Sequence, residues 1–211
     1  MAKSAAVTSG SDAKQPEGRI IHSFWVRVTH WVNAVAMVIM ICSGWRIYNA
    51  APIFNFEFPN SITIGGWLAG ALMWHFAAMW LLVINGLVYV TFGIFTGRFQ
   101  KRLFPIWPSE VMKDIKAAVT LHLSHEDLSV YNAIQRVLYL GVIFAGVVVV
   151  FSGVSIWKPT QLQELTALFG GYDFARVVHF LAMSAIVGFL LLHVLLATLI
   201  PRSLLAMIRG Y

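Results

Sequence analysis

The chain carries little charge for its length. Charged residues make up 11% of its 211 residues, whereas hydrophobic residues make up 59%. Soluble domains contain roughly 45–50% apolar residues, so this composition excludes an ordinary soluble fold and indicates a membrane protein. No separate soluble domain of useful size fits beside several membrane spans in this length, which argues against catalysis in a large soluble domain.

Cysteine is almost absent. Cys42 is the single cysteine and lies in the middle of a long apolar run. Covalent attachment of c-type haem needs two cysteines followed by a histidine, and iron–sulfur clusters need several thiolates. Both kinds of site are therefore excluded within this chain, and so is an internal disulfide.

Long hydrophobic runs are what the sequence does contain. About 20 apolar residues cross a bilayer as a helix, and four runs are long enough, at about 26–48, 64–95, 133–157 and 174–200. The second run exceeds a single crossing, so we expect it to tilt or to extend beyond the bilayer. The sequence predicts an all-α integral membrane protein, in which residues 19–211 form one four-helix transmembrane bundle with short loops.

Lysine and arginine are distributed unevenly over the two sides of this bundle. Of the 15 such residues, only Arg46, Lys158 and Arg176 lie on the side opposite the termini and the central loop. Cytoplasmic loops carry the excess of cations, so both termini are expected in the cytoplasm. The net charge of +6 is then a topology signal, and nucleic-acid binding is not indicated. Residues 1–18 are small and polar, so we expect a disordered cytoplasmic tail rather than a signal peptide.

The loops have two kinds of composition. The central segment "PSEVMKDIKAAVTLHLSHED" places apolar residues near helical spacing, which predicts a short amphipathic helix at the membrane surface. The outer segments "NAAPIFNFEFPNSITIG" and "KPTQLQELTALFGGYD" are unusually apolar for exposed loops. They are expected either to dock a partner or to lie in the lipid headgroups.

Four histidines lie within the apolar runs, where a titratable ring is costly and marks a candidate functional site. His179 and His193 are fourteen positions apart, about 40° short of four full helical turns, so they share one face of the fourth span. Their separation along the axis is about 21 Å at a rise of about 1.5 Å per residue. One metal ion or haem cannot bridge that distance, so each ring needs its own partner at its own depth.

Partners are present at both depths. His30 lies near the cytoplasmic start of the first span, level with His193, and His75 lies in the outer half of the second span, level with His179. Neutral imidazoles bind iron, and bis-histidine ligation of haem b places one imidazole on each face of a flat macrocycle between apolar helices. A lone membrane histidine more often forms an interhelical hydrogen bond or part of a proton path. Four at matched depths predict two b haems, with iron ligand pairs His30/His193 and His75/His179.

Two glycines fit the same arrangement. Gly44 is fourteen positions after His30, and Gly86 is eleven positions after His75. Each glycine therefore lies on nearly the same face of its helix as the histidine, but at the depth of the haem that this histidine does not bind. Glycine lets a porphyrin approach the backbone because it has no side chain. We predict that both glycines contact haem; ordinary helix packing in the membrane is the alternative reading.

Three segments carry a resemblance to a known family: "WVRVTHWVNAVAMVIMICSGWRIY", "WHFAAMWLLVINGLVY" and "RVVHFLAMSAIVGFLLLHVLL". They resemble the bacterial di-haem cytochrome b family, which includes the cytochrome subunits of nickel–iron hydrogenases and the gamma subunits of respiratory formate dehydrogenases. The resemblance covers all four spans, roughly residues 19–202. It implies that His30 and His193 hold the cytoplasmic-side haem and that His75 and His179 hold the periplasmic-side haem.

The resemblance also implies a function. It indicates a lipid-embedded subunit of the bacterial inner membrane that moves electrons between the quinone pool and a periplasmic redox protein, with no catalytic residue of its own. Quinone is then the exchangeable substrate, expected on the inner side by similarity to formate dehydrogenase. The partner is a molybdenum enzyme, a hydrogenase or a dehydrogenase. The segment "WHFAAMWLLVINGLVYVTFGIFTGRFQKRLFP" is most similar to members associated with sulfite-oxidase-type molybdenum proteins.

Two other functions remain open. A stand-alone membrane oxidoreductase, such as a superoxide:quinone oxidoreductase, would need a basic funnel on the outer surface, where only three cations lie. A non-redox transporter would need the intramembrane carboxylates that ion coupling normally uses, and the spans lack them. A haem spectrum separates the transporter from the other two, and a co-purifying partner separates the electron-transfer subunit from the stand-alone enzyme.

Overall fold

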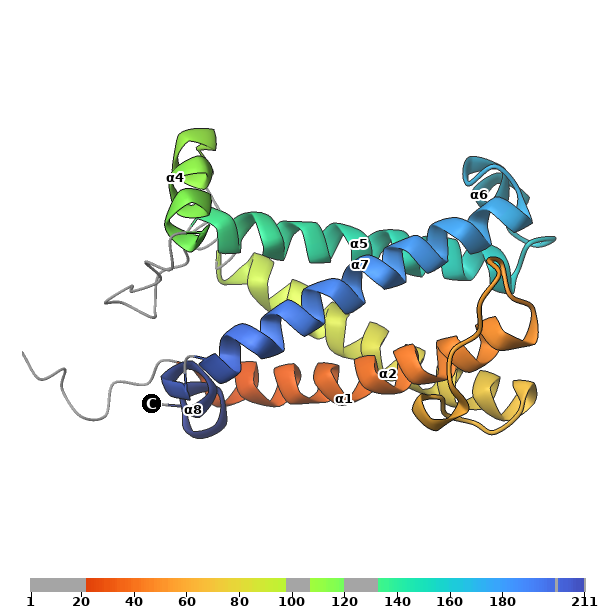
Figure 1. Ribbon diagram of the computed structural model, residues 1–211, viewed down its shortest axis with the longest axis horizontal. Helices are drawn as coiled ribbons and strands as arrows, with labels where there is room; N and C mark the ends of the chain where they lie inside the picture. Colours follow the sequence, from red (N-terminus) through yellow and green to blue (C-terminus); the bar gives the residue numbers. More distant parts are fainter. Residues whose placement is uncertain (1–21, 98–106, 120–132, 200, 211) are drawn as a thin grey trace, which may run out of the picture.

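The computed structural model describes residues 22–97, 107–119, 133–199 and 201–210. The predicted tail, residues 1–18, lies outside them. Within the described residues the chain is helical and contains no strand. Four long helices run along the longest axis of the molecule (Figure 1): α1 (Phe24–Ala50), α2 (Leu68–Phe95), α5 (Ala133–Trp157) and α7 (Tyr172–Leu199).

Each of these four helices is long and apolar enough to cross a membrane. The shortest, α5, has 25 residues, which at about 1.5 Å per residue exceeds a hydrocarbon layer of about 30 Å. Many large apolar side chains on the long helices are exposed in the isolated chain, as expected where lipid covers them. The predicted all-α fold with four apolar helices of spanning length is confirmed.

Successive long helices run in opposite directions, which gives the bundle two distinct ends (Figure 1). At one end α1 begins and α7 ends, beside α4 (Pro108–Val119) and α8 (Pro201–Arg209); this is termed the terminal end. The other end carries residues 51–67, with the short 3-10 helix η1 (Asn60–Ile62), and α6 (Gln163–Leu168); this is termed the loop end.

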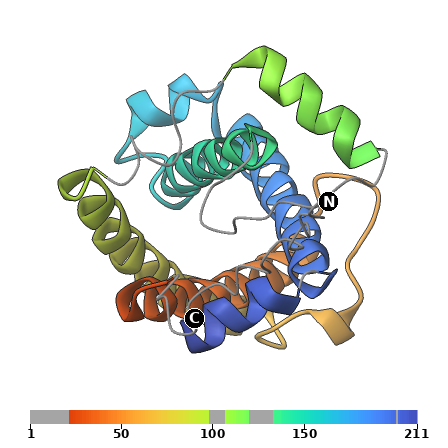
Figure 2. The ribbon, with the colours of Figure 1, turned by 90° about the vertical axis from the view of Figure 1, so that its left-hand side faces the viewer.

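The four long helices form two antiparallel hairpins. The backbone of α1 packs extensively against α2, and that of α5 against α7, whereas in the described part of the chain the two hairpins make few backbone contacts with one another. Figure 2 looks along the bundle from the terminal end and shows the α1–α2 hairpin facing the α5–α7 hairpin. Residues that project from opposite hairpins therefore meet between them.

The start of α2 differs from the sequence prediction. The apolar run begins at 64, but the helix begins at Leu68. Gly65 and Gly66 have φ angles of 107° and 68°, a backbone region that favours glycine and does not continue a helix. The amide of Ile64 instead donates to the carbonyl of Cys42 at 3.1 Å, so the chain turns against α1 before α2 begins.

Two amphipathic helices cover the terminal end. α4 falls within the segment predicted to hold a surface helix, and its Asp114 side chain accepts a hydrogen bond from the amide of Ala133 at 2.7 Å, at the start of α5. α8 was not predicted from the sequence. It is held against the start of α1 because Arg27 Nη1 donates to the carbonyl of Ile208 at 2.7 Å.

Candidate functional site

His30 and His193 meet near the terminal end, from α1 and α7. Their ring centroids lie 6.1 Å apart, with ring planes at 59°. Phe189, one turn earlier on α7, stacks on His193 at 5.8 Å. A metal ion held between two opposed imidazoles, with nitrogen–metal bonds of about 2 Å, places the ring centroids roughly 6 Å apart. The observed separation therefore suits one iron between these rings.

His75 and His179 come together in the half of the bundle near the loop end, from α2 and α7. They are close enough to interact electrostatically. Nδ1 of His179 lies 2.9 Å from the carbonyl oxygen of Val149 on α5. A carbonyl only accepts hydrogen bonds, so Nδ1 of His179 carries the proton and its Nε2 keeps the lone pair.

Two serines act on the same histidines. Ser43 on α1 has its Oγ 3.0 Å from Nδ1 of His75, and Ser152 on α5 has its Oγ 3.2 Å from Nδ1 of His179. Each hydroxyl has one proton, which Ser43 donates to the carbonyl of Ile39 at 2.6 Å. Ser152 likewise donates to the carbonyl of Val148 at 2.7 Å.

The serine hydroxyls therefore accept from the imidazoles. The hydrogen-bond network assigns the proton of both histidines to Nδ1 and leaves Nε2 of each as a free donor atom. A metal-ligating histidine almost always donates its second ring N–H to a carbonyl or another acceptor in this way. His75 and His179 are thus held in the tautomer that ligation through Nε2 requires.

Glycines make room for both of these rings. A Cβ on Gly44 would lie 3.4 Å from Cε1 of His75, and one on Gly153 would lie 3.0 Å from Cε1 of His179. The nearest described neighbour of Gly44 is therefore an imidazole. A Cβ on Gly86 would have no described atom within 4 Å. The predicted contacts of Gly44 and Gly86 with haem stay predictions.

Sequence reasoning missed three of these residues: Ser43, Ser152 and Gly153. Serine and glycine in an apolar span are usually read as small packing residues. The available signal is the dipeptide Ser-Gly, which occurs in "CSGW" of the first span and in "FSGV" of the third. Both serines are completely buried, although many large side chains on the same helices are exposed.

A polar contact also joins α1 to α2 beside His30. The side-chain amide of Asn85 donates to the carbonyl of Thr29 at 2.8 Å and to Oδ1 of Asn33 at 2.7 Å. Thr29 and Asn33 flank His30 on α1, so this contact fixes the helix that carries the histidine. Hydrogen bonds of this kind hold membrane helices together where no hydrophobic driving force acts between them.

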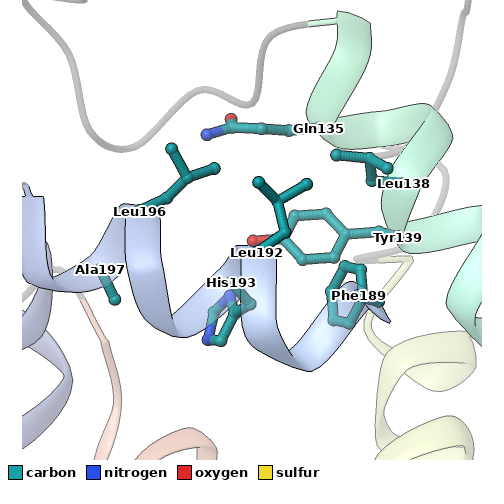
Figure 3. A pocket seen from close by; sticks show the side chains of 8 residues that line it. All are labelled: Gln135, Leu138, Tyr139, Phe189, Leu192, His193, Leu196 and Ala197. Carbon is teal, nitrogen blue, oxygen red and sulfur yellow. The ribbon is translucent and has the colours of Figure 1, made fainter. Parts of the chain in front are cut away.

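A small pocket of about 100 Å³ lies between α5 and α7 toward the terminal end (Figure 3). Gln135 and Tyr139 from α5 and His193 from α7 contribute its polar groups. The rest of its lining is apolar: Leu138, Phe189, Leu192, Leu196 and Ala197. His193 extends to the side away from Gln135 in Figure 3 and also contacts His30. His193 therefore belongs to the terminal-end pair and also lines the pocket.

The loop end is closed by aromatic side chains. Phe180, next to His179 on α7, contacts Tyr48 of α1 and Phe54 and Phe56 of the loop, with centroids 5.1–6.1 Å apart. Arg176 Nη2 donates to the carbonyl of Ala51 and ties this loop to α7. Residues 51–67 are thereby folded against the bundle close to the loop-end histidines.

The donor set fits haem b better than a bare metal ion. Among the described residues, no cluster of three or more histidine, cysteine, aspartate or glutamate side chains could hold a metal ion. Each pair instead offers two imidazoles, from hairpins whose backbones stand apart. Two imidazoles in an apolar gap between helices would suit a haem, which would supply the remaining iron ligands itself.

Comparison with known proteins decides the family. The profile of the family described as prokaryotic cytochrome b561 matches residues 21–210. The chain belongs to the prokaryotic cytochrome b561 family. The family implies haem b and electron transfer in a membrane. Together with the four apolar helices, it fits a multi-pass protein of the inner membrane. The predicted relationship to bacterial b-type cytochromes is confirmed.

Two relatives illustrate the range of this cytochrome family. The chain is 53% identical over 191 residues to the "Putative protein-methionine-sulfoxide reductase subunit YedZ1" of Azospira oryzae, covering 90% of this chain and 96% of the relative. It is 22% identical over 210 residues to the "Probable Ni/Fe-hydrogenase B-type cytochrome subunit" of Bradyrhizobium diazoefficiens, covering 90% and 83%. Both relatives are named as subunits of redox enzymes.

Proposed function

We propose that this cytochrome b561 binds two haems b and carries electrons across the inner membrane, from the quinone pool to a periplasmic methionine-sulfoxide reductase. The observation that carries the proposal is the pairing of four histidines, from opposite hairpins, at two depths. Haem b supplies a one-electron carrier when it is bound. The chain's own residues hold the two sites, set their spacing and exclude water.

The two sites use different residues. His30 and His193 hold the haem nearer the terminal end, and His75 and His179 hold the one nearer the loop end. Gly44 of α1 is assigned to the loop-end site, and Gly86 of α2 is assigned to the terminal-end site. Each helix thus passes close to the haem to which it gives no ligand. The spacing of His179 and His193 along α7 separates the two sites by about 21 Å of helical rise. Two such sites in series link the two membrane surfaces.

Orientation follows from the cations. Among the described residues, Arg46, Lys158 and Arg176 belong to the loop-end half of the bundle, whereas the cations of α4, of α8 and of the first turns of α1 and α5 lie at the terminal end. The positive-inside rule then puts the terminal end, with both chain termini, in the cytoplasm. The loop end faces the periplasm and is the surface from which a periplasmic partner exchanges electrons.

The partner and the direction follow from the 53% identical relative, which is named as a subunit of a methionine-sulfoxide reductase. Reduction of a sulfoxide to a thioether consumes two electrons and two protons. Electrons must therefore leave the bundle toward the partner and enter it from quinol. A sulfite-oxidase-type molybdenum enzyme is the kind of partner that we expect from the sequence resemblance.

We place the quinone site at the pocket beside His193. Gln135 and Tyr139 provide polar groups for a quinone oxygen, and the remaining lining is apolar. The pocket, of about 100 Å³, is smaller than the usual ligand pocket of about 300–1,000 Å³, so only the headgroup enters and the tail stays in lipid. Entry here delivers electrons first to the His30/His193 site.

No observation favours the stand-alone oxidoreductase. Two of the three loop-end cations hold the structure of the loop: Arg46 Nη1 donates to Oδ1 of Asn60 at 2.7 Å, and Arg176 to the carbonyl of Ala51. The third, Lys158, lies over the ring of Trp157 at 4.8 Å. The described part of the loop end therefore offers no basic funnel for a small anion.

Purification of the tagged chain from its own membranes in mild detergent tests the function. We expect a quinol analogue to reduce its haems, and we expect the same preparation to couple quinol oxidation to reduction of methionine sulfoxide in an oxidised protein. A chain whose haems respond to quinol but whose co-purified enzyme does not act on sulfoxides would contradict the partner. Haems that quinol fails to reduce would contradict the quinone assignment.

A further inference from the structure

The two loop-end histidines are held by matching devices. In each hairpin, a buried serine on the neighbouring helix receives the Nδ1 hydrogen of the imidazole, Ser43 for His75 and Ser152 for His179. The next residue in each case is a glycine, and the missing side chain leaves room for Cε1 of the same ring. Each Ser-Gly pair thus fixes one ring from its own hairpin.

This geometry also aims the other ring nitrogen. Nδ1 and Nε2 point toward nearly opposite sides of an imidazole. Because Nδ1 of His75 is tied to α1 and Nδ1 of His179 is tied to α5, Nε2 of each ring is directed away from its own hairpin, toward the space between the hairpins. Both lone pairs are therefore available to a group held between the hairpins.

The terminal-end pair lacks this device. Among the hydrogen bonds that the described residues make, none joins a ring nitrogen of His30 or His193 to an acceptor. These rings have aromatic neighbours instead, Trp31 edge-on to His30 at 5.4 Å and Phe189 stacked on His193 at 5.8 Å. The two sites thus have the same ligand type and different surroundings.

We propose that Ser43 and Ser152 are positioning residues that fix the orientation and tautomer of the loop-end histidines and lower the reduction potential of the haem there relative to the other. The inference rests on the proposed binding of two haems. An Nδ1–H that donates to an acceptor makes Nε2 more basic, and a more basic axial ligand stabilises ferric iron. Second-shell hydrogen bonding of this kind is one of the means by which a protein tunes a haem potential.

Each histidine keeps a backbone acceptor when its serine is truncated. The carbonyl of Val149 lies 2.9 Å from Nδ1 of His179, and the backbone of Met40 also hydrogen-bonds His75. Both alanine variants should therefore raise the potential in the same direction while a second acceptor still holds each ring.

A redox titration of the purified cytochrome, followed by optical spectra and by the EPR signals of ferric low-spin haem, tests the proposal. Both alanine variants should raise the midpoint potential of the same one of the two haems, shift its EPR signal and leave the other unchanged. Ser43→Thr keeps a hydroxyl and should retain the original potential. Ser184→Ala is the matched control, because Ser184 donates to the carbonyl of Phe180 on its own helix at 2.8 Å.

Histidine variants identify which haem moves. With His193→Ala, only the loop-end haem should remain, and Ser43→Ala should still raise its potential. With His179→Ala, only the terminal-end haem should remain, and Ser43→Ala should have no effect on it. If Ser43→Ala loses a haem, Ser152→Ala supplies the measurement, since Val149 still holds the ring.

The outcomes separate this inference from the function on which it rests. A protein with fewer than two haems would contradict the proposed function. Two haems whose potentials and EPR signals ignore both alanine variants would overturn the role of the serines and leave the function intact. An equal shift of both haems would also overturn it, because the serines contact only the loop-end histidines.

Discussion

The backbone carbonyl of Val149 accepts a hydrogen bond from Nδ1 of His179 at 2.9 Å. This contact ties the ring to α5 at one depth, while His193, fourteen positions later on α7, faces His30. The two histidines of α7 therefore belong to separate histidine pairs. Changing one should leave the other site assembled, and this independence can be measured.

Removing a ligand from one pair should remove one haem. His179→Ala or His75→Ala should reduce the haem content by about half and leave the remaining haem reducible by a quinol analogue. His193→Ala or His30→Ala should cause the same loss of haem but block quinol-driven reduction, because electrons enter beside His193. Optical spectra of the four variants with and without the quinol analogue measure both effects.

Two outcomes would contradict this account. Equal loss of both haems in every variant would refute independent sites. Intact reduction of the loop-end haem in a variant that lacks the other haem would place quinone at the loop end.

Gly153→Ala should weaken the loop-end site more than Gly44→Ala. Its new Cβ would lie 3.0 Å from Cε1 of His179, against 3.4 Å from Cε1 of His75 for Gly44. Overpacking of this kind costs about 1–3 kcal/mol. The measurement is the temperature at which haem absorbance is lost in detergent. Gly141→Ala is the control, since a Cβ there meets no described atom within 4 Å and alanine favours a helix by up to about 1 kcal/mol. Equal effects of all three variants would contradict the role of the two glycines beside the rings.

Gly86→Leu distinguishes a haem contact from ordinary packing. A Cβ at Gly86 has no described protein atom within 4 Å, so a side chain can begin there without meeting the protein, and leucine favours a helix. If a porphyrin passes this position, the leucine side chain should displace the terminal-end haem and leave the loop-end haem in place. Haem content and quinol-driven reduction measure this. A Gly86→Leu protein with both haems would remove Gly86 from the haem site.

The fold was predictable from the sequence because spans depend on the length of apolar runs. The third run, 133–157, coincides with α5. Run length does not detect a segment that is apolar but not helical. For this reason the sequence did not show that Gly65 and Gly66, with their positive φ angles, precede the start of α2. It also does not detect α8, because that helix is short and amphipathic and begins at Pro201, directly after α7.

The site was only partly visible in the sequence. Helical periodicity placed His179 and His193 on one face, since this needs nothing beyond the position of each residue on one helix. The roles of Ser43 and Ser152 depend on which helix lies beside which, and on the rotation of each helix about its axis. Neither quantity follows from hydropathy, so these serines could be recognised only once α1 was packed against α2 and α5 against α7.

Topology can be tested with reporters fused after Tyr211. Because the loop-end half holds only Arg46, Lys158 and Arg176 among the described cations, the C-terminus should lie in the cytoplasm. A reporter that is active only in the cytoplasm should therefore work, and a periplasmic reporter at the same position should not. The opposite result would exchange the inner and outer haems and move the partner to the terminal end.

The number of haems per chain tests the central claim most directly. A pyridine haemochromogen assay on the purified cytochrome, with the chain concentration measured independently, gives the type of haem and its stoichiometry. Two histidine pairs at two depths predict close to two b-type haems per chain. A value near one would remove one of the pairs from the account, and a protein without haem would contradict the account as a whole.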